Sequence, residues 1–368
     1  NPDTAKLRAV SWFNYNTVIP PISLGQTLAY IDNSNKFSKM MELANIAREG
    51  EPSVVDASAA VPTLIPKDID LLTNSRENNL VLLGKTDSDE VIGWRYFNTG
   101  EERKQTAWFK WKHNNPLQYH FIVEDVYYFL DTDDFLQSIN LIQSDTDPSI
   151  TQDGVDFLLH IDNYTTIEGG AFNSTTNLTT FTDGTNSCEF TWQSSVTTPN
   201  GTLVLVDNNT DATRLGRYAE CTVVSAGTSF TVPGDWSSAT LHIGYLYEYN
   251  VEFPRFYKVE INRDTFNADV NAKLIVHRAK INFGKIGLYE TTLTRTGKDD
   301  YTEIWESTEL DEFDVSDAPY LAEDIRTIPI YEDNRNVRLA LKSSHPAPAT
   351  LRSMSWEGDY SPLYYRRV

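Results

Sequence analysis

The stretch "VIGWRYFNTGEERKQTAWFKWKH", residues 91–113, decides the fold of this 368-residue chain. It holds two aromatic-rich runs, 91–97 and 106–113, joined by a polar connection that is typical of a turn. Side chains alternate between the two faces of a strand. Trp94 and Arg95 are therefore expected on opposite faces of their strand, and Trp108 and Trp111 on opposite faces of the next strand. The aromatic rings therefore lie where an antiparallel strand pair in a mixed core-and-edge sheet needs them.

A second use of the same rings is a platform on which bases or sugars stack, because such platforms also carry exposed aromatics on strands. We expect burial within one subunit as the main role. Exposed members of the stretch are suited to contacts between subunits, where aromatic and Arg side chains are favoured. The candidate core or interface residues are Trp94, Arg95, Trp108, Trp111 and Lys112.

Short apolar segments flank this stretch at intervals of about ten residues, as expected for strands joined by tight turns. They include residues 80–84, 119–131 and 135–143, and the polar turns "KTDSDE", "NNPL" and "DTDD" separate the segments. Successive four-stranded units of this spacing are typical of a propeller blade, a sandwich or a barrel. The chain is therefore predicted to be all-β.

The composition changes over residues 144–240, which are rich in Thr, Asn, Ser and Gly. The segment still alternates, as in "GTLVLVDN" (201–208), so we expect a folded β-domain inserted into another domain. The predicted organisation is a first propeller-like part at 1–143, the insertion at 144–240, and a return to the first domain at 241–368.

One segment, "FSKMMELANIARE" (37–49), contains good helix formers, and Ser38 is a suitable cap. From these residues alone, helix and strand remain equally open.

The chain carries 52 Asp and Glu against 31 Lys and Arg, a formal net charge of −21. Proteins that grip nucleic acid normally carry an excess of cations, because affinity comes largely from phosphate neutralisation. A sequence-specific nucleic-acid binder is therefore disfavoured. The densest acidic segment is "ESTELDEFDVSD" (306–317), with Glu306, Glu309, Asp311, Glu312, Asp314 and Asp317.

Catalytic and metal-binding patterns are weak. The six histidines are scattered, without the spacing of a metal site. The acidic turns at 131–134 and 144–154 lack the residue order of a calcium loop, which favours solvated turns. We expect no catalytic residue, no metal and no cofactor. Cys188 and Cys221 are expected to be reduced strand residues, and a single bridge between them is the open alternative.

Several segments, in order, resemble the C-terminal half of the tail tubular protein B family, the nozzle proteins of short-tailed bacteriophages (podoviruses). The order and spacing of these segments cover the chain except for the Thr-rich insertion. The chain opens on "NPDTAKLRAV" without Met, so we expect it to be part of a longer protein. The matching segments are "VIPPISLGQTLAYIDN" (18–33), "KFSKMMELA" (36–44), "VVDASAAVPTLI" (54–65), "NNLVLLGK" (78–85), "RKQTAWFKWKH" (103–113) and "HPAPATLRSMSWEGDYSPLYYRRV" (345–368).

The resemblance implies a structural virion protein at the tail tip and not an enzyme. Members of the family form a sixfold ring below the adaptor protein (tail tubular protein A), with tail fibres around the junction, and genomic double-stranded DNA leaves through the channel. The resemblance also implies an irregular β-propeller with inserted β-domains, in which "KFSKMMEL" (36–43) forms a strand.

A wall along which DNA slides should repel it, so part of the acidic cluster at 306–317 is expected to line the channel. A solvated outward loop is the alternative for that cluster. The second functional hypothesis is a carbohydrate-binding or glycoside-cleaving tail spike, which would also use aromatic strands and many carboxylates.

Overall fold

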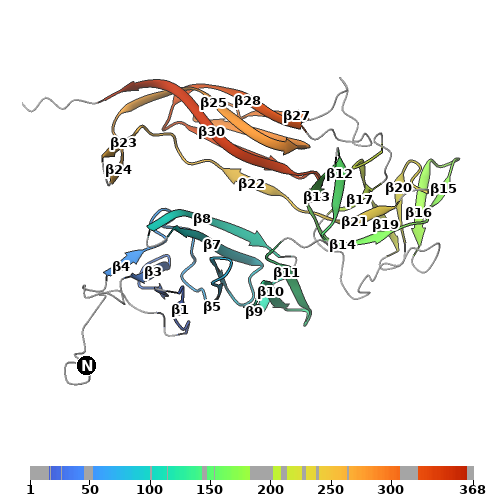
Figure 1. Cartoon of the computed structure of the whole chain (residues 1–368), viewed down its shortest axis with the longest axis horizontal. Coiled ribbons are helices and arrows are strands. Elements are labelled where there is room, and N and C mark those ends of the chain that lie inside the picture. Colours follow the sequence, from blue (N-terminus) through green and yellow to red (C-terminus); the bar gives the residue numbers. More distant parts are fainter. Residues whose placement is uncertain are drawn as a thin grey trace, which may run out of the picture. The chain divides into compact units, whose positions relative to one another are not determined.

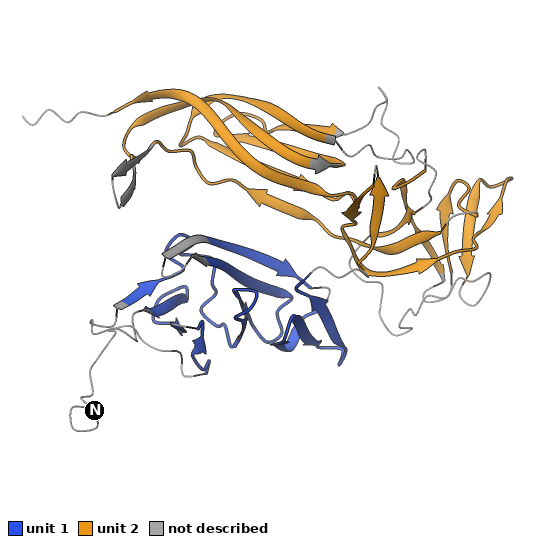
Figure 2. Ribbon diagram, viewed as in Figure 1, with its two compact units in different colours: residues 1–145 blue, residues 146–368 orange. Residues whose placement is uncertain are grey.

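The computed structural model describes residues 16, 18–25, 27–44, 53–99, 102–113, 115–142, 147–152, 154–182, 202–208, 214–225, 229–237, 240–262, 265–306 and 322–362. Every regular element in these ranges is a β-strand, and the sheets are short and antiparallel, so the predicted all-β, irregular propeller-like fold is confirmed. The chain divides into two compact units, residues 1–145 and 146–368 (Figure 2). The three-part division at residues 143 and 240 stays a prediction.

Unit 1 (residues 1–145) contains three described sheets, each built from strands that follow one another in sequence (Figure 1). Its turns use Asn79 and Asp87 at φ 50° and φ 64°, a left-handed conformation that Asn and Asp adopt more readily than other side chains. The first sheet has β1 (Ile22–Ser23), β2 (Leu28–Asp32), β3 (Lys39–Ala44) and β4 (Ser53–Asp56); the second has β5 (Leu71–Ser75), β6 (Leu80–Gly84), β7 (Glu90–Thr99) and β8 (Glu102–Lys112); the third has β9 (Leu117–Val123), β10 (Val126–Asp131) and β11 (Leu136–Asn140).

The second sheet lies between the other two, and its strand β6 is buried on both faces. All five residues of β6 are buried. Val81 and Leu83 belong to the core shared with the first sheet, whereas Leu80 and Leu82 belong to the core shared with the third. A strand buried on both faces needs a continuous apolar run and not an alternating one, which explains the sequence "LVLLG".

The register of β7 and β8 agrees with the faces predicted from the sequence. Trp94 pairs with Trp108, and Val91 pairs with Trp111. Trp94 is fully buried against the first sheet, while Trp111 packs towards the third.

The segment with helical propensity forms a strand where the structure describes it. Residues 39–44 are β3, which pairs with β2 and β4, and Met40 and Met41 are buried. The helix alternative is wrong there, because two ladders of backbone hydrogen bonds and the burial of Met40 outweigh a weak local propensity. Residues 45–49 lie outside the described residues.

Unit 2 (residues 146–368) contains two larger cores in its described part. A sandwich of two four-stranded sheets encloses Phe181, Phe230 and Trp236. A second pair of sheets, one with three long strands, encloses Val276, Phe283 and Leu339. The strands of unit 2 are β12 (Ser149–Gln152), β13 (Val155–Leu158), β14 (Ile161–Ile167), β15 (Ala171–Asn173), β16 (Leu178–Thr182), β17 (Leu203–Asp207), β18 (Tyr218–Glu220), β19 (Thr222–Ser225), β20 (Ser229–Pro233), β21 (Leu241–Leu246), β22 (Tyr249–Glu252), β23 (Val259–Asn262), β24 (Thr265–Ala268), β25 (Lys273–Ile286), β26 (Leu288–Arg295), β27 (Tyr301–Glu306), β28 (Ala322–Asp333), β29 (Val337–Ser343) and β30 (Ala349–Ser361).

The loop before β30 attaches the sandwich to the long-stranded sheets. The Pro346 carbonyl accepts a hydrogen bond from the His160 amide at 2.7 Å. Ala347 is buried in a small cluster with Val204 and Val206 of the sandwich strand β17. This contact fixes the two parts of unit 2 to each other.

Replacing Gly93 by Ala should lower the free energy of unfolding by about 1–3 kcal/mol, the usual cost of overpacking a core. The Phe109 ring lies over Gly93, and an added methyl group would come within 2.0 Å of its Cζ atom. Urea unfolding followed by Trp fluorescence measures the loss. Combining G93A with Phe109→Leu should cost less than the sum of the two single changes, and strict additivity would contradict the predicted clash.

Candidate functional site

The three tryptophans of the opening stretch serve packing. The Trp94 ring stacks on Trp108 with centroids 5.9 Å apart, and Trp111 lies 5.0 Å from Phe109. Trp108 and Trp111 are half-buried, and Trp94 has no exposed face on which a base or sugar could stack.

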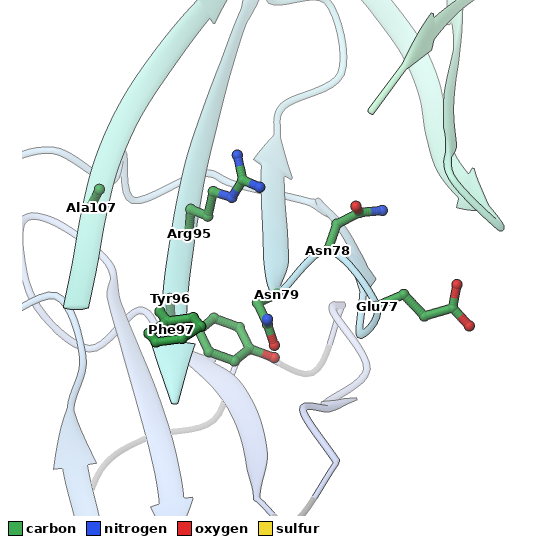
Figure 3. A pocket seen from close by; sticks show the side chains of 7 residues that line it. All are labelled: Glu77, Asn78, Asn79, Arg95, Tyr96, Phe97 and Ala107. Atoms are coloured by element: carbon green, nitrogen blue, oxygen red, sulfur yellow. The ribbon is translucent and has the colours of Figure 1, made fainter. Parts of the chain in front are cut away.

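Two candidate cations of the stretch, Arg95 and Lys112, are exposed. Lys112 lies 3.5 Å from the Asp89 carboxylate, measured from Nζ to Oδ2. Arg95 forms no ion pair with any other residue that the structure describes, and it lines a surface pocket of about 420 Å³ (Figure 3). The other lining residues are Glu77, Asn78, Asn79, Tyr96, Phe97 and Ala107.

Backbone and side-chain hydrogen bonds hold this pocket in shape. The Asn79 carbonyl accepts a hydrogen bond from the Tyr96 amide at 3.0 Å, which ties the β5–β6 turn to β7. The Asn78 amide group donates to Asp125 Oδ1 at 2.9 Å and to Ser75 Oγ at 3.1 Å. A guanidinium beside fixed amides and the exposed ring of Phe97 suits a ligand with one anionic and one apolar part.

The acidic cluster of 306–317 lies almost entirely outside the described residues. Glu306 is the last residue of β27. Glu309, Asp311, Glu312, Asp314 and Asp317 are among the residues not described. Their role in lining a channel stays a prediction.

A larger charge asymmetry lies elsewhere in the chain. Residues 114–240 carry 17 Asp and Glu but only two cations, Arg214 and Arg217. Lys is absent from residue 113 to residue 257. This lack of cations can be read from the sequence, but the higher local density of acidic residues at 306–317 made that shorter segment the more obvious candidate.

Both arginines of this acidic segment are committed to one buried carboxylate. Arg214 Nε lies 3.2 Å and Arg217 Nε 3.0 Å from Oδ2 of Asp207, whose side chain is fully buried. Arg217 also covers the Trp236 ring at 4.1 Å and donates to the Asp235 carbonyl. Because both arginines pair with the buried Asp207, they do not neutralise the exposed carboxylates of Asp156, Glu168 and Glu220. These carboxylates therefore make the surface potential negative.

The acidic turn at 131–134 uses its first carboxylate, Asp131, as a hydrogen-bond acceptor. Asp131 Oδ1 accepts from the amides of Asp133 and Phe135, both at 3.0 Å, and Oδ2 accepts from Gln137 Nε2 at 2.7 Å. The described residues contain no group of three or more potential metal ligands.

The buried histidines are neutral packing residues. Burial lowers the pKa of both His113 and His120 to about 4, and that of His345 to about 3. His120 Nδ1 lies 3.2 Å from the Tyr127 hydroxyl, and the Nε2 atoms of His113 and His120 have no hydrogen-bond partner among the described residues. Groups of this kind resist protonation and are poor general acids at neutral pH.

Cys221 is a free, half-buried thiol between β18 and β19. Burial raises its pKa, which makes the thiol unreactive. Cys188 lies outside the described residues. No helix in the described part of the chain is long and apolar enough to cross a membrane.

Comparison with known proteins identifies one family. Residues 1–367 match the family model described as "Bacteriophage nozzle protein". No curated protein matches the chain.

Among solved structures, the chain is similar to an exo-β-1,3-galactanase from Phanerochaete chrysosporium with galactose, at 9% identity and a TM-score of 0.20. This match covers 93% of the chain and 66% of the galactanase. A variant of the same enzyme with β-1,3-galactotriose gives 9% identity and a TM-score of 0.21, covering 94% of the chain and 67% of that structure. Scores of this size carry no conclusion about fold or chemistry.

Acid should destabilise unit 1 through its buried histidines. Their pKa lies near 4 in the fold and near 6.5 in the unfolded chain, so the unfolded state binds more protons between these values. The histidine contribution to stability is complete above about pH 6.5 and is lost as the pH falls towards 4. Urea unfolding at a series of pH values measures this slope. H113Q with H120Q should flatten it, and an unchanged slope in this variant would refute the assignment.

Asp207→Asn should lower the free energy of unfolding by about 3–5 kcal/mol, because it leaves Arg214 and Arg217 half-buried without their charge partner. Chemical denaturation of the purified chain measures the change. Glu220→Gln, at an exposed site nearby, should alter stability by no more than about 0.5 kcal/mol. Equal effects of the two variants would show that Asp207 has no special structural role.

Proposed function

Because this chain belongs to the bacteriophage nozzle protein family, we propose that it is a subunit of a homohexameric ring that conducts genomic double-stranded DNA out of the phage tail. The family makes the chain a structural component of the virion tail. In our proposal the ring forms the tip of a short tail, and the chain corresponds to the C-terminal half of a tail tubular protein B.

The observation that carries the conduit proposal is the charge of residues 114–240. A duplex presents about one negative charge per 1.7 Å of its length, and each Lys or Arg that neutralises a phosphate adds affinity by releasing a counterion. A wall without free cations adds no such affinity. It also repels the duplex over a Debye length of about 8–10 Å at physiological salt. Both effects favour fast passage over binding.

A ring at the end of a phage tail would contact four kinds of partner: copies of itself, the adaptor protein, the tail fibres and the DNA. Neighbouring copies contact one another through two different surfaces, as closed rings require. The adaptor protein (tail tubular protein A) binds above the ring, and tail fibre proteins bind around the junction. DNA is a transient and non-specific partner. The ring needs neither a catalytic residue nor a cofactor.

We also propose that residues 144–240 form a domain inserted between the parts 1–143 and 241–368. Most of the sandwich core lies within this range, and β21 (Leu241–Leu246), just beyond residue 240, completes it. A unit with a core of its own can be inserted into another domain without disturbing the host.

The carbohydrate alternative has no support in the described residues. The rings of Trp94, Trp108 and Trp111 pack in the cores of unit 1, and the galactanase similarity is too weak to transfer a function. Electron microscopy of the purified chain tests the ring directly. Sixfold rings with an open axis are expected, and a trimeric spike or release of saccharide from host surface material would refute the conduit.

Reversing charge in the acidic segment should slow DNA ejection. Asp156→Lys with Glu220→Lys adds two cations to its exposed surface, and each new phosphate contact should steepen the salt dependence of DNA binding by about 0.9. Ejection kinetics of phage that carry the variant, and DNA binding by the purified ring, measure the effect.

The matched control is D299K with D300K, which makes the same charge change at exposed positions of unit 2 outside the segment. A lysine-substituted 306–317 cluster tests the other candidate wall. If D156K with E220K ejects DNA at the wild-type rate, residues 114–240 do not face the duplex.

A further inference from the structure

We propose that the Arg95 pocket binds a carboxylate from a second copy of this chain, at the contact between neighbouring subunits. This inference rests on the proposed ring and adds the chemistry that would hold two of its subunits together. The pocket itself is defined by the seven residues given above and shown in Figure 3.

Arg95 differs from the lysines around it in having no acidic partner within the described part of its own chain. Lys39 pairs with Asp56 at 3.2 Å, and Lys110 pairs with Glu90 at 2.7 Å. Arg95 lies on the same strand pair as Lys110, and its neighbour on β8 is the small residue Ala107. Among the described residues no acidic side chain pairs with the guanidinium, which can therefore donate to a group from outside.

The residues that line the pocket favour a planar anion, bound through two oxygen atoms, over an anion bound through a single atom. Figure 3 shows Arg95 extending from β7 towards the turn with Asn78 and Asn79, while the Glu77 side chain is directed away from it. A guanidinium presents a rigid fork of N–H donors that matches both oxygens of a carboxylate. Phe97, with 54% of its surface exposed, offers apolar contact to the methylene groups of an incoming Asp or Glu.

Charge complementarity selects a second copy as the source of that carboxylate. The chain has a net charge of −21, and residues 114–240 carry 17 acids with both of their arginines held by Asp207. Any neighbouring copy thus presents mainly carboxylates to Arg95. A symmetric contact of Arg95 pockets would set cation against cation, so the contact must join two different surfaces. This is the head-to-tail geometry from which a ring is built.

The test is the assembly of the purified chain, measured by mass photometry and sedimentation over a range of concentrations. Arg95→Glu should raise the concentration of half-assembly by at least about tenfold, because it sets two carboxylates against each other. Arg95→Lys should have a smaller effect, since an ammonium keeps the charge but loses the fork.

Arg76→Glu is the matched control. It makes the same charge change at an exposed arginine in the same β5–β6 turn, outside the pocket lining, and should assemble like the wild type. Arg95→Gln, which removes the charge without adding another, provides a second variant if R95E unfolds; thermal melting identifies that case. R95Q should also make assembly less sensitive to NaCl between 0.1 and 1 M, because a screened attraction has been removed.

The outcomes separate the two proposals. If R95E and R95Q assemble like the wild type and R76E, the carboxylate pocket is wrong and the ring remains. If R76E weakens assembly as much as R95E, the effect is one of overall charge and the pocket is again wrong. If the wild-type chain stays monomeric at every concentration, both the ring and the pocket fail.

Discussion

Burial of strand β6 of the second sheet on both faces is the constraint on which unit 1 depends. This strand contributes side chains to two separate cores, and each buried Leu or Val contributes about 1.5–3 kcal/mol. The aromatic stretch completes the same arrangement, with Trp94 on one face and Trp111 on the other. The large rings are therefore needed for stability, and Gly93 is needed because the Phe109 ring occupies the space of a side chain.

Asp131, Asp207 and His120 show how buried polar groups are accommodated within the described residues. Asp131 is held by backbone amides and Gln137, and Asp207 is held by two arginines. His120 remains neutral beside the Tyr127 hydroxyl. These groups are structural because burial without a partner is costly for a charge. None of them has the exposure or the protonation state that catalysis would require.

The pairing at Asp207 also connects stability with surface charge. By neutralising the buried carboxylate, Arg214 and Arg217 are withdrawn from the surface, which then carries carboxylates without free cations. The acidity of this surface is thus a consequence of how the sandwich satisfies its interior. Arg95, which forms no ion pair within the described residues, is a cation available for the contact that we propose between copies of this acidic protein.

The sequence by itself determined the all-β class, the alternation of β7 and β8, and the excess of acid, because strand period and composition are local properties of the chain. It left residues 39–44 undecided, since the choice between helix and strand depended on pairing with β2 and β4. Only the tertiary structure showed that β6 is covered on both faces, and that Arg95 meets Asn78 in a pocket. It also decided which carboxylate Arg214 and Arg217 neutralise. These features join residues on different strands and turns. Burial and charge pairing, the energies that select them, exist only once the sheets have packed.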